Sequence, residues 1–197
     1  MKKFNKYDTA KVKRATFQQL PKGAYVIKIL SVKEEANSSG NGSHLKIAFD
    51  IAEGEYMDFY KKIFDQNTNK DKKWPNDAVH HMSVPDDDSP QWMIDNFRTF
   101  TDALEESNQG YHWDWDERRW KGLKIGALFC IEQSEYNDTI YDHTRPKWFR
   151  PAEDIRQNRY GKLPRDKMIS SSSGSGITTD SDGFMTLPAT SEEELPF

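Results

Sequence analysis

Between residues 145 and 160 the sequence interleaves aromatic and basic side chains more densely than anywhere else in the chain. Unpaired nucleic acid exposes the faces of its bases and its phosphates, so aromatic platforms beside Lys and Arg are the groups that can hold it. Because side chains alternate across a strand, we expect Trp148 to point outward beside Arg150 and Phe149 to point into the core. The candidate contacts in this segment are Arg145, Lys147, Trp148, Arg150, Arg156, Arg159 and Tyr160.

Other basic and aromatic residues could extend the same surface. Trp74 follows a lysine-rich loop, and several lysines fall on the expected polar faces of strands. A single tryptophan is commonly a core residue and a single lysine is commonly solvated, so only their clustering supports a binding role. The additional candidates are Lys28, Lys46, Lys61, Lys62 and Trp74. By contrast, Trp113, Trp115 and Trp120 lie in an acidic segment that would repel phosphates, and we predict that they pack between the helix and the sheet.

Catalytic chemistry has weaker support in the sequence. The carboxylates at 86–88 and 114–117 could hold Mg²⁺ for a nuclease, because that ion prefers oxygen ligands. Asp-rich loops are usually solvated turns, however, and the first group precedes a predicted helix N-terminus, where negative charge is favourable. The only cysteine, Cys130, cannot supply a Cys/His zinc site, and no glycine-rich phosphate loop occurs. We predict no catalytic residue, no metal site and no cofactor.

The net charge of −4 hides a strong segregation of charge along the 197 residues. Five carboxylates lie beyond the last basic residue, Lys167, and the chain without them is close to +1. Residues 1–33 carry nine basic groups against one acidic group. The single cysteine fits a reducing compartment, and the sequence has neither a membrane-spanning apolar run nor a signal peptide at its N-terminus. We expect a cytoplasmic protein with no membrane partner.

The chain divides into three parts by composition: a basic N-terminal arm (1–22), one domain of ordinary size (23–168) and a polar, disordered tail (169–197). Within the domain, runs rich in β-branched and aromatic residues predict strands, and apolar residues at helical spacing after Ser89-Pro90 predict a helix that ends near Asn108. The five predicted strands are 24–32, 44–52, 56–64, 123–133 and 147–155.

Three strands, one helix and two strands is the chain order of the OB-fold. We therefore predict a mainly β protein, a five-stranded OB-fold Greek-key barrel with one α-helix between strands 3 and 4. Such barrels bind ligands on their middle strands and on the loops between strands 1 and 2 and between strands 4 and 5. In this sequence these loops are predicted at 35–43 and 134–146.

The last six residues form a second candidate site. An acidic run is followed by a short apolar tip that ends in a free carboxylate, and the spacer before it is rich in Ser, Thr, Gly and Asp. On a partner protein the terminal ring could fill an apolar pocket while the carboxylates meet Arg and Lys at its rim. The predicted protein-interaction residues are Glu192, Glu193, Glu194, Leu195, Pro196 and Phe197.

This tip resembles the C-terminal peptide of bacterial and phage single-stranded-DNA-binding proteins, which is acidic and ends in Pro-Phe. It differs from the commonest cellular form in having Glu instead of Asp and Leu195 before the proline. The order of elements, with the segments 49–55 and 111–116, is similar to the phage and prophage type of these proteins.

The resemblance implies a protein that coats single-stranded DNA without sequence specificity in the bacterial host cytoplasm. It also implies that the tail recruits proteins of DNA replication, recombination and repair, and it allows a homo-oligomer. Two other readings stay open: a protein-protein adaptor of a replication complex that does not bind DNA, and a Mg²⁺-dependent nuclease.

Overall fold

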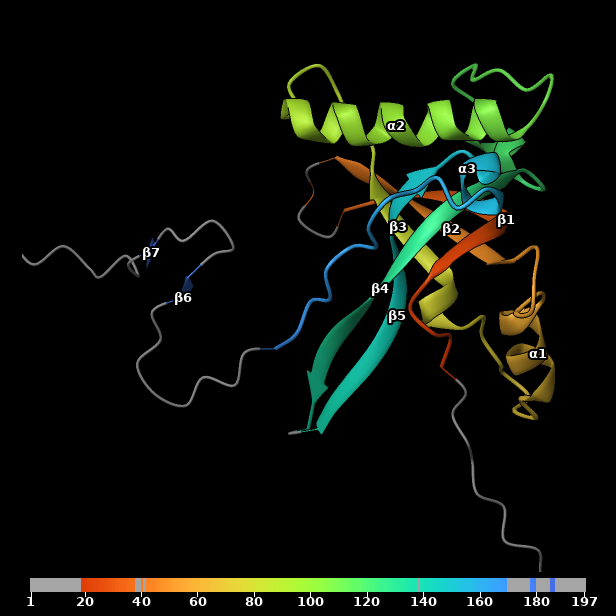
Figure 1. Cartoon of the computed structure of the whole chain (residues 1–197), viewed down its shortest axis with the longest axis vertical. Helices are drawn as coiled ribbons and strands as arrows, with labels where there is room; N and C mark the ends of the chain where they lie inside the picture. Colours follow the sequence, from red (N-terminus) through yellow and green to blue (C-terminus); the bar gives the residue numbers. More distant parts are fainter. Residues whose placement is uncertain are drawn as a thin grey trace, which may run out of the picture.

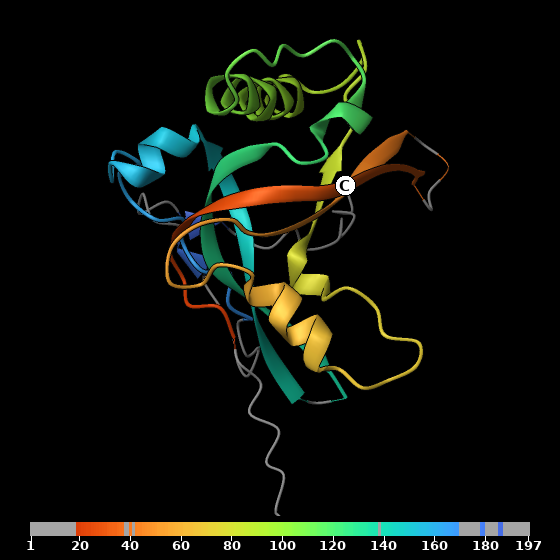
Figure 2. The same cartoon turned by 90° about the vertical axis from the view of Figure 1, so that its right-hand side faces the viewer.

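The computed structural model describes residues 19–37, 40, 42–137 and 139–169, together with the short strands β6 (Thr178–Thr179) and β7 (Met185–Thr186), which pair with each other. The basic arm lies almost wholly outside these residues. The domain is mainly β, with three short or medium α-helices around one large sheet (Figures 1 and 2).

The large sheet has five antiparallel strands in the order β3-β2-β1-β4-β5. Its strands are β1 (Ala24–Ala36), β2 (Ser43–Ile51), β3 (Val79–Ser83), β4 (Lys124–Tyr136) and β5 (Thr139–Arg150). The first part of β1 pairs with β4 and its longer remainder pairs with β2, with a register shift near Leu30. Backbone pairing leaves β3 and β5 as the two edges, so the sheet is not closed into a barrel.

One apolar core fills the space between the concave sheet and α2 (Gln91–Ser107). The strands contribute alternating residues such as Ile29, Ile47 and Phe49, each at most 1% exposed. The helix contributes Phe97, Phe100 and Leu104, which recur at helical spacing. In Figure 1, α2 lies across the upper end of the sheet, and the β4–β5 hairpin extends from the other end.

The helix predicted after Ser89-Pro90 is confirmed as α2, and it lies between β3 and β4. Trp113 and Trp120 pack beside it as expected, with ring centroids 5.0 Å apart. Trp120 is fully buried and its ring also contacts Phe100. Trp115 differs from the prediction, because its side chain is 81% exposed.

The prediction of a strand at 56–64 was wrong, because this segment contains α1 (Phe59–Gln66). The helix buries Phe59 and Tyr60 and exposes the next two lysines, a pattern that an alternating strand cannot produce. Buried Asp50 accepts hydrogen bonds from the backbone N–H groups of Tyr60 and Lys61, both at 2.9 Å. These contacts satisfy two of the N–H groups that a helix leaves unpaired at its start. The third strand comes later, as β3, after the 3-10 helix η1 (Asn76–Ala78).

The other correction concerns β5. The predicted loop at 134–146 belongs mostly to the β4–β5 ladder, which continues out to the pair Tyr136 and Thr139. At the other end β5 stops at Arg150, and Pro151 leads into α3 (Ala152–Arg156) where the sequence predicted more strand. Gly126 of β4 permits this close packing, since a Cβ there would lie 2.4 Å from the Ile155 side chain and 2.8 Å from the Arg150 carbonyl oxygen.

Candidate nucleic-acid interface

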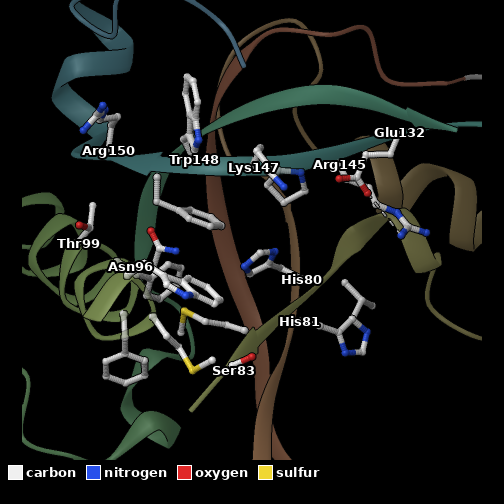
Figure 3. A pocket seen from close by; sticks show the side chains of 18 residues that line it. His80, His81, Ser83, Asn96, Thr99, Glu132, Arg145, Lys147, Trp148 and Arg150 are labelled. Carbon is white, nitrogen blue, oxygen red and sulfur yellow. Dashed lines mark ion pairs between the residues drawn. The ribbon is translucent and has the colours of Figure 1, made fainter. Parts of the chain in front are cut away.

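A cleft of about 640 Å³ lies where the two edge strands and α2 meet. We call it the β5 cleft; it is lined by β3, by residues 92–100 of α2 and by Glu132 with residues 145–150 (Figure 3). Side chains bridge the two sheet edges here. The His80 ring lies 4.9 Å from the Phe149 ring, and Arg145 reaches Asp77 of η1, just before β3, at 3.5 Å.

The strand β5 places four of the predicted contact residues along this cleft: Arg145, Lys147, Trp148 and Arg150. Within the described residues, the side chains of Lys147 and Arg150 have no hydrogen-bond or ion-pair partner, whereas Arg145 also lies 4.0 Å from Glu132. Two cations without an ion-pair partner in the described residues therefore flank Trp148. Such cations are available for an external anion such as a phosphate.

The opposite orientations predicted for Trp148 and Phe149 are confirmed. Trp148 is 46% exposed, whereas Phe149 is partly buried and packs against Phe100 with ring centroids 4.7 Å apart. Figure 3 shows Trp148 and Arg150 projecting from the same side of β5, away from the interior of the cleft. Lys147 has no partner on β4, because Leu128 pairs with Trp148 and Phe129 pairs with Pro146. This β-bulge interrupts the alternation of side chains along β5, which explains why Lys147 and Trp148 are both exposed although they are adjacent.

A second hollow, of about 600 Å³, brings together three other predicted residues: Lys28, Lys61 and Trp74. We call it the α1 groove; it lies between α1 and strands β1 and β2. The indole of Trp74 donates a hydrogen bond to the Phe49 carbonyl oxygen at 3.3 Å and packs on Phe64. Lys61 pairs with Asp65 at 2.6 Å, so most polar groups of this hollow already have partners.

The structure does not bring the remaining predicted residues into either hollow. Lys46 lies on the outer face of the sheet, opposite Lys33 and His81, and Lys62 donates to the Met57 carbonyl oxygen at 2.8 Å.

Three residues that follow β5 in the sequence are used within the fold instead. Arg156 makes two hydrogen bonds to Glu53, at 2.9 and 2.8 Å, and Arg159 pairs with Asp154 at 2.9 Å. Tyr160 packs on the small apolar cluster around Leu128. The expected grouping of all these cations around Trp148 was therefore wrong in part: α3 turns the chain away after Arg150.

Sequence reasoning missed three residues of the β5 cleft: His80, Trp92 and Asn96. Trp92 is 62% exposed on the first turn of α2. His80 is partly buried, and burial, followed by the charges of His81 and Lys147, lowers its pKa to about 4. The imidazole is therefore neutral at pH 7, with one donor and one acceptor nitrogen. The one available signal was Trp92, two residues after Pro90, because it falls on the face of an amphipathic helix that normally carries polar residues.

The β4–β5 hairpin extends the same side of β5 beyond the cleft. Tyr141 and Arg145 are four residues apart on the strand and so share a face. Tyr136 and Tyr141, near the tip, are 69% and 46% exposed. The hairpin therefore adds two rings to the aromatic and basic groups of the cleft.

Two of the acidic groups considered for a nuclease are paired with cations, and Asp86 accepts a hydrogen bond from the Ser89 hydroxyl at 2.7 Å. Asp114 pairs with Arg119, and Asp116 pairs with Arg118 at 2.8 Å. Across the described ranges, no three His, Cys, Asp or Glu side chains are arranged to hold a metal ion. Likewise, no helix in this part of the chain is long and apolar enough to cross a membrane.

The predicted tail site, residues 192–197, lies outside the described residues. Comparison with known proteins adds no identification: no protein-family model and no curated protein matches this sequence.

Proposed function

We propose that this protein is a non-enzymatic single-stranded-DNA-binding protein of the phage type, which coats unpaired strands with little sequence preference. The observation that carries the proposal is the arrangement on one strand of exposed Trp148 between Lys147 and Arg150, two cations without a partner in the described structure. A base can stack on the indole while its neighbouring phosphates meet the two cations.

We further propose that the domain is an OB-fold, which is a partly open five-stranded barrel. The sheet order leaves β3 and β5 as the edges, and closing it would bring these two strands together. One side-chain contact already links them, because the His80 ring contacts Phe149, and His143 of β5 lies 2.9 Å from Asp77 of η1, which directly precedes β3. The helix between β3 and β4 covers one end of the sheet, as the chain order of that fold requires.

Selectivity for unpaired strands follows from the kind of contact. Stacking on Trp148 needs an exposed base face, and a duplex hides its base faces within its own stack. A duplex could still be attracted by Lys147 and Arg150, but only through its phosphates. Single strands should therefore bind more tightly, and both modes should weaken with salt.

The test is a titration of the full chain with oligo-dT and with a duplex of the same length, followed by tryptophan fluorescence at several salt concentrations. We expect tighter binding of oligo-dT, with an affinity that falls steeply as salt increases. Equal affinity for the two ligands, or binding that ignores salt, would contradict the proposal. Absence of binding to either ligand would favour the adaptor that never touches DNA.

We also propose that residues 192–197 recruit replication, recombination or repair proteins. Deletion of Leu195–Phe197 should abolish capture of such partners and leave the affinity for oligo-dT nearly unchanged. Loss of DNA binding in that variant would show that the tip serves the DNA site instead.

A further inference from the structure

The β5 cleft has two walls of different chemistry. On the β5 side, Lys147 and Arg150 are cationic and have no partner in the described structure, with Arg150 projecting away from the cleft interior, while Glu132 lies 4.0 Å from Arg145. On the α2 side, the residues that line the cleft are uncharged; Asp95 and Arg98 are interspersed among them in sequence, and Arg98 is paired with Asp102 at 2.8 Å. A phosphate is attracted to the first wall, whereas the lining residues of the second wall include no cation. A nucleotide that enters the cleft must therefore place its phosphate toward β5 and its base toward α2.

The α2 wall offers the groups that a base requires. Trp92 supplies a ring that is 62% exposed, while buried Phe97 and Phe100 form the apolar floor. Asn96 of α2 and His80 of β3 both line the cleft (Figure 3). In the described structure, neither the Asn96 amide nor the His80 ring nitrogens have a hydrogen-bond partner. Amide and neutral imidazole groups each supply a donor and an acceptor, which match the polar edge of a base.

The size of the hollow agrees with such a ligand. Its volume of about 640 Å³ falls within the roughly 300–1,000 Å³ typical of sites that enclose small molecules. The α1 groove is similar in volume, but its indole N–H and Lys61 already have partners within the protein. The β5 cleft thus combines space, an apolar floor and unused polar groups.

From these observations we propose that the β5 cleft takes up one unstacked base of the bound strand against α2, with Trp92 as the stacking residue. The inference rests on the proposed single-stranded-DNA binding and adds a helix wall to its site. Trp148, which projects from β5 away from the cleft interior, then serves a neighbouring base, so that two bases of the strand lie on separate rings.

The test compares two ligands of equal length and charge, oligo-dT and an oligomer made only of abasic nucleotides. Trp92→Ala should weaken oligo-dT binding roughly five- to 150-fold, the range for loss of one stacked base, and should leave the affinity for the abasic oligomer unchanged. The matched control is Trp115→Ala, which removes another exposed indole, on the acidic segment outside the cleft, and should change neither affinity. Because Trp92 is mostly exposed, its removal should not unfold the chain, which circular dichroism can verify.

Three results would overturn the inference while the proposed function stands: an equal loss on both ligands, no loss on either, or the same loss in Trp115→Ala. In those cases wild-type protein still binds oligo-dT, and Lys147→Ala/Arg150→Ala still weakens binding of both ligands. Failure of the wild-type protein to bind either ligand would instead overturn the proposed function, and this inference with it.

Discussion

The β5 cleft and the α1 groove are hollows of similar volume, about 640 and 600 Å³, but their polar groups are satisfied differently. In the α1 groove, Asp50 caps a helix, Lys61 pairs with Asp65, and Lys124 pairs with Glu53 at 2.8 Å. In the β5 cleft, Lys147, Arg150 and Asn96 have no partner in the described structure.

The difference suggests that the α1 groove serves mainly the stability of the fold and the β5 cleft mainly the binding of a ligand. Polar groups that already have partners contribute to the stability of the fold, because removing one leaves a desolvated partner behind. Polar groups without partners contribute little to folding and can be used for a ligand. Substitutions around the α1 groove should therefore reduce stability, and substitutions in the β5 cleft should reduce affinity for DNA.

The largest effect should come from Asp50→Ala. Its side chain is 4% exposed and accepts three backbone hydrogen bonds, from Ile51, Tyr60 and Lys61. Losing them should lower the free energy of unfolding by about 3 kcal/mol, because buried N–H groups lose their acceptor. Urea denaturation measures this change. The control is Asp65→Ala on α1, the helix that Asp50 caps; it breaks only an exposed ion pair and should change the free energy of unfolding far less. Similar losses in both variants would refute the capping role of Asp50.

Next in size is the effect of removing cations from β5. The variant Lys147→Ala/Arg150→Ala should bind oligo-dT roughly 25-fold more weakly at 0.1 M salt, and the slope of log affinity against log salt should fall by about 1.4. Its matched control is Arg156→Ala/Arg159→Ala, which loses the same number of charges but from side chains paired with Glu53 and Asp154.

We expect this control to lose a small amount of stability, since exposed ion pairs are worth about 1 kcal/mol or less. Its affinity for DNA should stay within about threefold, because both arginines are already used within the fold. Filter binding and thermal denaturation of both double variants separate the two outcomes. If the two variants lost DNA affinity equally, binding would depend on net charge alone, and the distinction between the two regions would fail.

A smaller effect is expected from Trp148→Ala, about 1.5 kcal/mol of binding free energy, which is within the range for one stacked base. The control is Tyr160→Ala, another aromatic from the same predicted segment, which packs on the Leu128 cluster and should reduce stability instead. Fluorescence anisotropy of a labelled oligo-dT measures the first effect. Equal affinity of wild type and Trp148→Ala would remove Trp148 from the interface.

The sequence predicted the parts of the fold that depend on local periodicity. Alternation identified β1, β2 and β4, and helical spacing after Pro90 identified α2. It failed at 56–64, because the helix there depends on a cap from Asp50, which lies nine residues before α1 begins. A contact of that kind is set by tertiary structure and leaves no local pattern.

The same reasoning explains which site residues could be predicted. Lys147, Trp148 and Arg150 lie on one strand, so strand periodicity and clustering were enough to group them. Arg156 and Arg159 were grouped with them wrongly, because α3 and the distant Glu53 decide where Arg156 points. His80 and Trp92 come from β3 and α2, and only the folded arrangement brings them to β5.

The smallest predicted effect concerns Glu53, one of the paired groups that stabilise the fold, and it is measured by varying the pH. Hydrogen bonds from Arg156, and then from Lys124, lower the pKa of Glu53 to about 2. The pKa of this carboxyl group is lower in the folded chain than in the unfolded chain, where it is about 4.3. The group therefore stabilises the fold at pH values above about 4.3, and this contribution is lost as the pH falls toward 2. Wild-type protein should therefore be more stable than Glu53→Gln by about 1 kcal/mol at pH 7, since the pair is partly solvated. Urea denaturation of both proteins between pH 7 and pH 2 should show this difference shrinking below about pH 4.5. A difference that stayed constant down to pH 2 would mean that the Glu53 side chain stabilises the fold by packing and not by its charge.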